Sequence, residues 1–357
     1  GQVLRRLPGI TVSDAGQISY KGQPIKNFYI EGLDLMKGRY GIATNNIDPN
    51  SISTIEVLEN HQDIKALKDL KPEERASINL KLKSGVKGVF NLIATLGGGY
   101  VDKLLWDNEL ITTYFQRNSQ LLATYKGNNS GTDLESELRS HTDYDYSRTS
   151  TISDIAMPAT PGINKRYYYF NQSHSATYNQ VFRVGKNGEL GINAAYLNDR
   201  DERSNQSVTT TLLPDGSKNV VDESFNGILH RNIANGNITY MQNTERNYIK
   251  EQLKFDWLST DGYSNIYAGE DIIQENNVEN YRLHNLFHLT SRTGSDKGVE
   301  FLSKINLEKK PHSLSVAPNL FPDVIMSEQM FQSADKVFCL IADTFPGQLI
   351  CIAVRKP

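Results

Sequence analysis

Cysteine is scarce in this sequence. Its 357 residues include only Cys339 and Cys351, both close to the C-terminal end. Two cysteines in a chain of this length give no disulfide framework, and their spacing is not that of a zinc site. The seven histidines are scattered, apart from His284 and His288, which share one face of an expected strand. We expect these two to lie in a polar row that faces a lumen; a metal-binding pair is the alternative. We predict no metal and no other cofactor.

Long apolar runs and an excess of charge are also missing. No run of about 18 apolar residues occurs, which argues against a transmembrane helix. The mean hydropathy of -0.48 still suits a β-barrel, whose strands alternate between lipid and lumen. The net charge is -3, so neither a basic surface for nucleic acid nor an acidic disordered chain is expected. The chain starts at Gly1 without the features of a signal peptide, so we expect its true beginning to lie upstream.

Aromatic and small polar residues are plentiful, with 18 Tyr and 13 Phe beside many Asn, Gly, Ser and Thr. Aromatic residues suit the pleated surface of a strand, and the small polar residues suit turns. Composition therefore predicts a mainly β fold.

Residues 1–83 are predicted to form a small α/β domain, because short apolar segments alternate with turns that contain Gly or Asp. A helical turn is expected to open at Asp48. The expected strands lie at 10–12, 18–20, 27–30, 52–58 and 76–83.

Residues 84–310 are predicted to form an antiparallel meander, the first part of an outer-membrane barrel. Residues of opposite polarity alternate from Tyr248 to Trp257, so that one face is apolar and one is wet. Long loop 131–165 and hairpin turns at Asn187-Gly188 and Asp215-Gly216 separate such runs. Roughly nine to eleven strands are expected from this alternation, at 90–100, 107–116, 119–126, 167–184, 190–196, 219–230, 233–241, 248–257, 264–290 and 299–307.

Three carboxylates, Asp199, Asp201 and Glu202, lie where an expected strand runs into a loop. Acid–base or calcium chemistry is one interpretation of such a cluster. We predict instead that these side chains form a solvated rim.

The texture changes in residues 311–357. The alternation stops, both cysteines appear, and Pro318, Pro322 and Pro346 interrupt the segments that remain. We predict that this tail does not belong to the preceding pattern and derives from a frameshift or a truncated gene. A divergent C-terminal extension is the alternative.

Motifs occur in a fixed order in the N-terminal block. Leu7-Pro8-Gly9 precedes an expected strand, Glu31-Gly32 ends another, and Glu56-Val57 lies in a third. Segments 64–67 and 76–83 then lead toward the first alternating strand. Together these motifs resemble the plug domain of TonB-dependent outer-membrane receptors, with Glu31 where many members have Asp. The resemblance covers residues 1 to about 307. Segments 28–35, 38–47 and 59–67 are similar to those of Bacteroidota-type receptors. Receptors of that type often carry a carboxypeptidase-regulatory-like domain ahead of the plug.

The resemblance implies energised uptake of a scarce solute across the outer membrane, without covalent chemistry, so no enzyme is expected. Its implied partners are the TonB energy-transducing complex, outer-membrane lipid and a surface lipoprotein. Receptors of this family have about twenty-two strands, so we expect a fragment that does not transport by itself. The loop 37–46 is expected to be a structural turn, with contact to the solute as the alternative. Its contact candidates offer charge, an aromatic face and amides: Arg39, Tyr40, Asn45 and Asn46.

Three other classes fit parts of the pattern. A plug-less adhesin or porin-like barrel would share the strands but would not need residues 1–83. A small outer-membrane barrel enzyme would fit the number of strands but would leave no room for an internal domain. A soluble β-sandwich is the third alternative.

Overall fold

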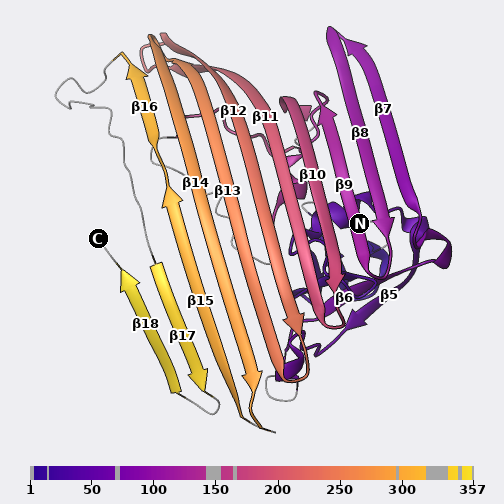
Figure 1. Ribbon diagram of the computed structural model, residues 1–357. Coiled ribbons are helices and arrows are strands. Elements are labelled where there is room, and N and C mark those ends of the chain that lie inside the picture. The colour runs from indigo at the N-terminus through magenta and orange to yellow at the C-terminus, as the bar shows by residue number, and fades with distance from the viewer. Residues whose placement is uncertain are drawn as a thin grey trace.

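The computed structural model describes residues 4–13, 16–68, 73–141, 154–163, 167–294 and 297–318, together with the backbone of strands 337–344 and 348–355. Two units follow one another along the chain, a small N-terminal domain and a long antiparallel sheet (Figure 1). The predicted mainly β fold, with a small α/β unit ahead of an antiparallel meander, is confirmed.

The N-terminal domain contains two small sheets and one short helix. Strands β1, β2 and β3 form an antiparallel sheet, and β6 lies between β4 and β5 in the second. Strand β6 runs parallel to β4 and antiparallel to β5, so the expected strand 76–83 is the centre of this domain. The elements are η1 Leu4–Arg6, β1 Ile10–Val12, β2 Ile18–Tyr20, β3 Gln23–Pro24, β4 Phe28–Ile30, α1 Tyr40–Asn46, η2 Pro49–Ser51, β5 Ile52–Leu58, η3 Lys65–Leu67, β6 Ser77–Leu82 and η4 Ser84–Val86.

Local signals account for much of this domain. Asp48 caps the turn η2 by accepting a hydrogen bond from the Asn50 amide, and Pro49 occupies the first position of that turn. Residues 40–46 differ from the expected loop, because they form helix α1. Six of the seven helical residues are buried, so packing rather than helix propensity stabilises α1. Gly16 permits this packing, because a Cβ on Gly16 would lie 2.9 Å from the Cα of Gly41.

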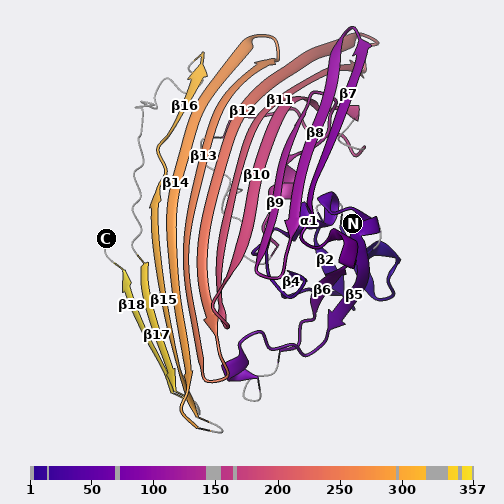
Figure 2. The ribbon, with the colours of Figure 1, turned by 45° about the vertical axis from the view of Figure 1, so that its right-hand side comes forward.

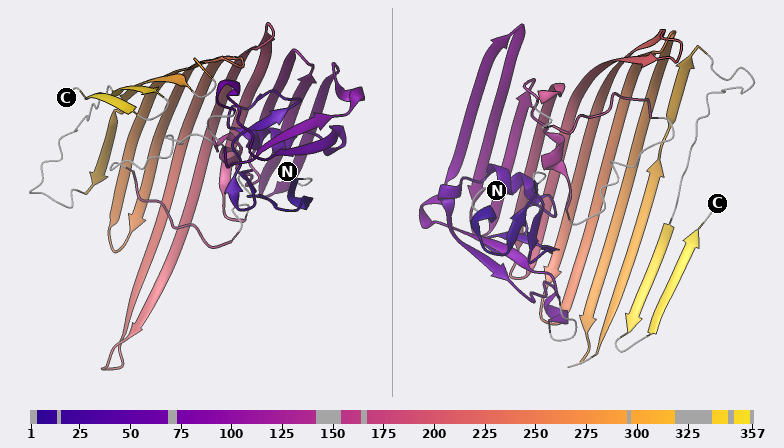
Figure 3. Two further views of the ribbon diagram at one scale, coloured as in Figure 1. Left: turned by 90° about the horizontal axis from the view of Figure 1, so that it is seen from below. Right: turned by 180° about the vertical axis from the view of Figure 1, so that it is seen from behind.

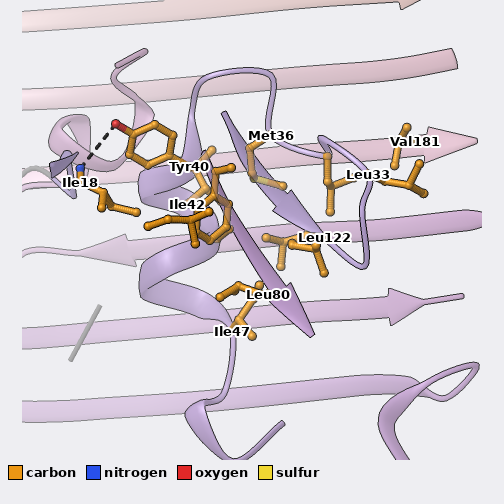
Figure 4. Close-up of a cluster of buried hydrophobic side chains, with 14 of the residues drawn as sticks. Ile18, Leu33, Met36, Tyr40, Ile42, Ile47, Leu80, Leu122 and Val181 are labelled. Atoms are coloured by element: carbon orange, nitrogen blue, oxygen red, sulfur yellow. Dashed lines mark hydrogen bonds between the residues drawn. The ribbon is translucent and has the colours of Figure 1, made fainter. Parts of the chain in front are cut away.

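The apolar core of the molecule lies between the N-terminal domain and the sheet. Figure 4 shows Leu122 and Val181 of the sheet in one cluster with Leu33 and Leu80 of the domain. Each of these four side chains is at most 2% exposed. The burial of several large apolar side chains, at about 1.5–3 kcal/mol each, is sufficient to hold the two units together.

The large sheet has twelve strands, and each paired neighbour is antiparallel. Its order follows the chain from β7 to β15, with β17 and β18 beyond β15 and with β16 paired to β14. The strands are β7 Phe90–Val101, β8 Lys103–Phe115, β9 Ser119–Asn128, β10 Phe170–Val184, β11 Gly188–Leu212, β12 Lys218–Asn243, β13 Asn247–Tyr267, β14 Asp271–Arg292, β15 Gly298–Lys309, β16 His312–Ala317, β17 Val337–Thr344 and β18 Gln348–Arg355.

The division of the sheet into strands differs from the expected one at two places, and several strands are longer than expected. The runs 219–230 and 233–241 belong to the single strand β12, because its pairing with β11 continues without a break through Arg231 and Asn232. The run 264–290 is divided between β13 and β14 by a turn in which Gly269 has a φ of 90°. The hairpin turns expected near residues 187 and 215 are both present.

The two ends of the sheet differ. The connections β8–β9, β10–β11, β12–β13 and β14–β15 are short and lie at one end, which we call the short-turn end. At the other end, β11 and β12 extend to 25 and 26 residues, and the long connection between β9 and β10 begins there. The sheet curves, and the N-terminal domain lies against one face of it near β7 to β10 (Figures 2 and 3). We call this face the inner face.

The tail contributes backbone pairing. Strand β16 pairs with residues 273–278, near the start of β14, and β17 pairs with β15. The predicted frameshift or truncation concerns the gene, so it stays a prediction; residues 319–336, 345–347 and 356–357 lie outside the described part of the chain.

Candidate functional site

The outer face of the sheet is apolar, as the strand register shows. Cross-strand partners point to the same side of a sheet, so a register row follows one face from strand to strand. We call three adjacent rows the outer belt. The first contains Leu92, Thr112, Ala123, Tyr178, Ala194, Gly236, Phe255, Leu283 and Leu307. The second contains Phe90, Tyr114, Leu121, Gln180, Ile192, Ile238, Leu253, Asn285 and Ile305, and the third contains Ala94, Leu110, Tyr125, Ala176, Tyr196, Ala234, Trp257, Tyr281 and Lys309.

Large side chains of the outer belt are open to the surroundings. Leu92 is 59% exposed, Ile238 51% and Phe255 44%. The amides within the belt are bonded locally, since Gln180 accepts from the Tyr178 hydroxyl and Asn285 donates to Glu251. A continuous apolar surface of this kind on nine strands marks a surface that is covered by something apolar.

The outer belt ends at a polar row toward the end of the sheet opposite the short-turn end. Tyrosines and a tryptophan occupy the last row of the belt, and the polar row follows two residues further along each strand. On strands β8 to β14 the polar row contains Asn108, Gly127, His174, Asn198, Asn232, Ser259 and Glu279, whereas on β7 the same row has the exposed Leu96. The Tyr196 hydroxyl donates to Asn232 at 2.9 Å, and the Tyr281 hydroxyl donates to Glu279 at 2.7 Å. These aromatic side chains therefore have an apolar ring in the belt and a hydroxyl at its edge.

The inner face has the opposite polarity. One register row, which we call the inner polar row, lies between the first two rows of the outer belt. It contains Asn91, Thr113, Leu122, Asn179, Asn193, Asn237, Lys254, His284 and Asn306. Side-chain amides bond across strands, with Asn193 to Asn179 at 3.0 Å and Asn237 to Asn193 at 3.1 Å. These three asparagines are at most 7% exposed.

The inner polar row also bonds the N-terminal domain. Asn193 donates to the Leu35 carbonyl at 2.8 Å, and Gln120 of β9 donates to the Ile30 carbonyl at 2.8 Å. Both sheet side chains are buried. The sheet therefore fixes the backbone of the domain through amides on its inner face.

The connection between β9 and β10 folds back over the inner face. The short helical turn η5, Glu135–Leu138, contacts α1, and the His141 amide donates to the Gly38 carbonyl at 3.0 Å. The His141 ring packs against Tyr40, with centroids 4.8 Å apart. Glu137 accepts from Lys126 at 2.9 Å. This part of the connection is thus held between the domain and the wall.

A buried ion network fixes the same segment. Asp199 accepts from the Tyr169 hydroxyl at 2.7 Å, from Ser173 at 2.6 Å and from Arg231 at 2.6 Å, and Arg231 also pairs with Glu135 at 2.9 Å. This geometry corrects the expected solvated rim. Asp199 is only 3% exposed and Asp201 only 1%.

The rim prediction failed for Asp199 and Asp201 because the groups that cover them are distant in sequence. Glu202 is exposed, as predicted, and pairs with Arg200 at 3.0 Å. The period of the strand was the available signal, because Asp199 and Asp201 continue the alternate positions of Ala195 and Leu197 in β11.

A second stretch of the β9–β10 connection crosses further along the inner face. Ala156 donates its amide to Gln274 of β14 at 2.9 Å. Two strand glycines make room for this crossing. A Cβ on Gly227 would lie 2.4 Å from the Met157 sulfur, and a Cβ on Gly262 would lie 2.7 Å from Ile155 Cδ1.

A cavity of about 380 Å³ lies between the N-terminal domain and the short-turn end of β10 to β13. The domain contributes Tyr29, His61 and Asp63, among others, and the wall contributes Glu189 and Lys250. The Tyr29 and His61 rings meet edge to face, 5.9 Å apart. Burial raises the pKa of Tyr29 above its ordinary value, and the nearby carboxylate of Asp63 adds to this effect. The cavity is polar and charged, which suits passage or transient binding of a polar solute.

Helix α1 and the residue before it carry the predicted solute-contact residues. Tyr40 and Asn46 are buried: the Tyr40 hydroxyl accepts from the Ile18 amide at 3.4 Å, and Asn46 donates to the Ile42 carbonyl at 2.7 Å. Burial raises the pKa of Tyr40 to about 12, although the Ile18 bond opposes this shift. Arg39 is half-buried and borders a small cavity. Asn45 is exposed and donates to Glu137. Solute contact by these four residues stays a prediction.

The motif residues have structural contacts. Gly9 has a φ of 77°, and Leu7 packs on the core. Glu31 also has a positive φ, 50°, and its carboxylate accepts from the Leu82 amide at 2.6 Å and from Lys87 at 3.0 Å. Glu56 accepts from the Asn79 amide at 2.6 Å.

The remaining motif residues complete this arrangement. The Gly32 amide donates to Asn79 at 3.0 Å, Val57 packs against the core, and Pro8 is exposed. The longer side chain of Glu31 reaches the β6 backbone, which gives a physical reason for Glu at this position. The predicted role of these residues as a plug motif stays a prediction.

His284 and His288, which share one face of β14, lie on the inner face of the sheet. His284 bonds Asn306, and His288 pairs with Glu300 at 2.7 Å. No cluster of three metal-ligating side chains occurs within the described residues. None of the helices described is long and apolar enough to cross a membrane.

Comparisons with known proteins give distant structural likenesses. No protein-family model matches the sequence, and no curated protein does. FpvA of P. aeruginosa, solved with an iron-bound pyoverdine, is 13% identical with a TM-score of 0.35; 96% of this chain aligns with 52% of that protein. The copper transporter OprC is 10% identical with a TM-score of 0.28 over 96% of this chain and 58% of OprC. The alcaligin outer-membrane receptor FauA from Bordetella pertussis is 12% identical with a TM-score of 0.22 over 96% and 56%.

This chain thus spans a little over half the length of each of these three proteins. The TM-scores are well below the level expected of proteins that share a fold. The function of this chain is therefore inferred from its own geometry.

Proposed function

We propose that this chain is the plug domain and part of the barrel wall of an outer-membrane receptor of the TonB-dependent type, which takes up a scarce solute. One observation carries the proposal. The long sheet exposes an apolar belt, and its inner face packs against a folded N-terminal domain through an apolar cluster and buried amides. A soluble β-sandwich buries its apolar face instead.

The aromatic edge of the belt fits a bilayer. Along β13 the outer belt extends from Leu253 to Trp257, about 14 Å at 3.4 Å per residue. An outer-membrane barrel has an apolar band about 25 Å tall, edged by aromatic residues. Tyr125, Tyr196 and Trp257 occupy the edge row in this sheet. Outer-membrane lipid is accordingly the proposed covering of the belt.

The N-terminal domain supports a plug. Its carbonyls at Ile30 and Leu35 are bound by amides of the inner face. Irregular backbone is tolerated at membrane depth where protein surrounds it. A domain seated in this way counts against a plug-less adhesin or porin-like wall, and it leaves little interior for a small-barrel enzyme.

Uptake would require the rest of the wall and a source of energy. Among the described strands the sheet is open, with β7 at one edge and β18 at the other. We propose that the chain is a fragment, that a TonB complex acts on the plug of the complete receptor, and that a surface lipoprotein assists. In the complete receptor, Arg39 and Asn45 face the solute, and the cavity at Tyr29 lies on its route.

Fluorescence quenching tests the membrane assignment. The sequence has two tryptophans, so Trp106→Phe leaves Trp257 as the only reporter. After reconstitution with lipids brominated on their acyl chains, we expect strong quenching of Trp257 relative to unbrominated lipid. Unquenched Trp257 in a protein that stays monodisperse without detergent would refute the proposal.

Solute flux is a separate test of fragment status. Liposomes that contain this chain alone should show no flux of small solutes above protein-free liposomes. Solute-specific flux by the purified chain would contradict the fragment proposal and leave the membrane assignment intact.

A further inference from the structure

A second cavity lies where the chain passes from the N-terminal domain into the large sheet. It has a volume of about 370 Å³ and is separate from the cavity at Tyr29, although Arg183 borders both. Its lining comes from the domain, the β8–β9 turn and the end of β10. The lining residues are Glu31, Lys87, Phe115, Gln116, Arg117 and Arg183.

The backbone brings these residues together without the help of side chains. The Gly88 amide donates to the Phe115 carbonyl at 2.8 Å, and Lys87 forms a parallel bridge with Phe115. The Arg183 amide donates to the Asn118 carbonyl at 2.8 Å. The domain linker, the β8–β9 turn and β10 are therefore fixed around one space.

The charges around this space do not balance. Three cations line it, together with one carboxylate, Glu31. That carboxylate is already used, because it pairs with Lys87 at 3.0 Å and accepts from the Leu82 amide. Arg117 and Arg183 have no ion-pair partner among the described residues. Glu189, in the neighbouring cavity, interacts electrostatically with Arg183 but also with Lys37.

Two arginines facing one cavity repel each other, and an anion between them would remove that repulsion. The planar guanidinium presents a fork of donors that matches the oxygens of phosphate and carboxylate. Both arginine side chains are exposed, so a ligand can reach them, and the lining residue Phe115 is buried, at 2% exposed.

We infer that this cavity is an oxyanion site that binds a phosphate group through Arg117 and Arg183, with Lys87 beside it. The site joins the N-terminal domain to β8–β10, so an occupant stabilises the seated domain. Two sources carry this chemistry at the short-turn end, a free phosphate ester and the headgroup of an anionic phospholipid. The inference does not depend on which solute the receptor takes up.

The test uses the full chain in micelles of an uncharged detergent. Inorganic phosphate replaces chloride at constant ionic strength. The stability of the N-terminal domain at each phosphate concentration is measured from the hydrogen exchange of residues 76–82. We expect a saturable stabilisation. Arg117→Gln with Arg183→Gln should weaken phosphate binding by about tenfold or more, because hydrogen bonds to charged groups contribute most to such sites.

Arg246→Gln is the matched control. Arg246 is exposed in the β12–β13 turn at the same end of the sheet but does not line the cavity. Its variant should bind phosphate like the parent chain. A linear, non-saturable response to phosphate, or an equal loss in Arg246→Gln, would overturn the inference.

A second variant keeps the test valid if the double glutamine variant fails to fold. Arg183→Lys keeps the charge and loses the fork, so we expect affinity between those of the parent and the double variant. Affinity equal to that of the parent would also count against the site.

Lipid nanodiscs distinguish the two sources. If phosphate stabilises the chain in phosphatidylcholine nanodiscs but not in phosphatidylglycerol nanodiscs, a lipid headgroup already occupies the site. If phosphate acts equally in both, the site takes a soluble anion. Both results support the site, whereas no phosphate effect in either nanodisc contradicts it.

Discussion

Strand β6 of the N-terminal domain buries its large apolar side chains, whereas strand β12 of the sheet exposes a large apolar side chain beside a buried asparagine. In β6, Ile78 and Leu80 are at most 2% exposed. In β12, Asn237 is 7% exposed and its neighbour Ile238 is 51% exposed. The domain excludes apolar groups from the surroundings, whereas the sheet presents them. This difference in exposure is the one expected if water surrounds the domain and, as proposed, a bilayer surrounds the sheet.

The same contrast appears in how the buried faces are stabilised. The domain core is an apolar cluster that needs no directional bonds. The inner face of the sheet is held by amide bonds between strands and by the ion network at Asp199. Buried polar groups are stable only when they are bonded. The inner face is thus sensitive to single amides, and the domain is sensitive to lost volume.

Truncation of a phenylalanine in each region should give the largest difference in the stability of the N-terminal domain. Phe28→Ala removes a side chain that is 2% exposed in the domain core. We expect a loss of about 3–5 kcal/mol in domain stability, from lost burial and the cavity left behind. Hydrogen exchange of residues 76–82 measures this loss.

Phe255→Ala is the matched control for that truncation. Phe255 is 44% exposed in the outer belt, so its removal should leave domain stability nearly unchanged. Equal losses in the two variants would mean that the belt is packed like an ordinary core.

A charge in the outer belt should have the next largest effect. Ile238→Arg places a cation on the proposed lipid-facing surface, where such a change costs about 2–4 kcal/mol near the middle of a bilayer. Folding into lipid vesicles, measured by urea titration, should show this cost. Val220→Arg, at an equally exposed valine of the same strand beyond the belt, should show almost none. Similar behaviour of the two variants would contradict a membrane position for the belt.

Removal of one inner amide should have a smaller effect. Asn193→Ala leaves the Leu35 carbonyl and two asparagine side chains without a bond that they now have. Buried groups left unpaired cost about 1–3 kcal/mol. We expect this loss in the attachment of the domain, seen as faster exchange in residues 28–35.

Asn198→Ala, on the outer face of the same strand, provides the comparison for Asn193. Among the described residues the Asn198 side chain bonds Asn232 and no part of the domain, so the exchange of residues 28–35 should not change. Faster exchange in this control would show that the effect is not specific to the inner face.

The smallest expected effect concerns acid stability of the domain. Lys26 pairs with Asp63 at 2.5 Å and with Glu73 at 2.6 Å. Burial opposes the charged form of Glu73, but the bonds from Lys26 and Arg75 prevail and lower the Glu73 pKa below its ordinary 4.5. A lowered folded-state pKa gives stability that is present above the unfolded-state pKa and is lost as pH falls through the folded-state pKa.

Lys26→Met removes this dependence on pH. We expect the variant to be about 1 kcal/mol less stable than the parent near pH 7, and the two to converge below the ordinary pKa of Glu73. Denaturant titrations at several pH values, with domain exchange as the readout, measure both curves. A constant difference down to the lowest pH would show that the ion pairs at Glu73 do not contribute.

Local chemistry made parts of the fold predictable. Strand β5 has the bounds predicted for residues 52–58, because Asp48 and Pro49 set its start by turn chemistry. Alternation over many residues likewise predicted the strands of the sheet. Helix α1 was not predictable in this way, since Gly41 and Thr44 are weak helix formers and burial alone stabilises it.

The candidate site was less predictable than the fold. Among the proposed solute-contact residues, Tyr40 and Asn46 are buried by segments distant in sequence, Ile18 and His141 among them. Asp199 forms its ion network with Tyr169 and Arg231, which lie about thirty residues away on either side. Contacts of this kind depend on strand register, which a single sequence does not contain.

The sequence by itself determined the period of the strands, because alternation of polar and apolar residues permits only a two-faced ribbon. It also determined the turns, since Gly and Asp supply the backbone angles that hairpins need. Only the tertiary structure decided which face is inside. The alternation of polar and apolar residues along a strand is the same whether its inner face contacts water, an apolar core or a folded domain. The N-terminal domain bonds the amides of the inner face through Ile30 and Leu35, and this attachment leaves the apolar belt outside.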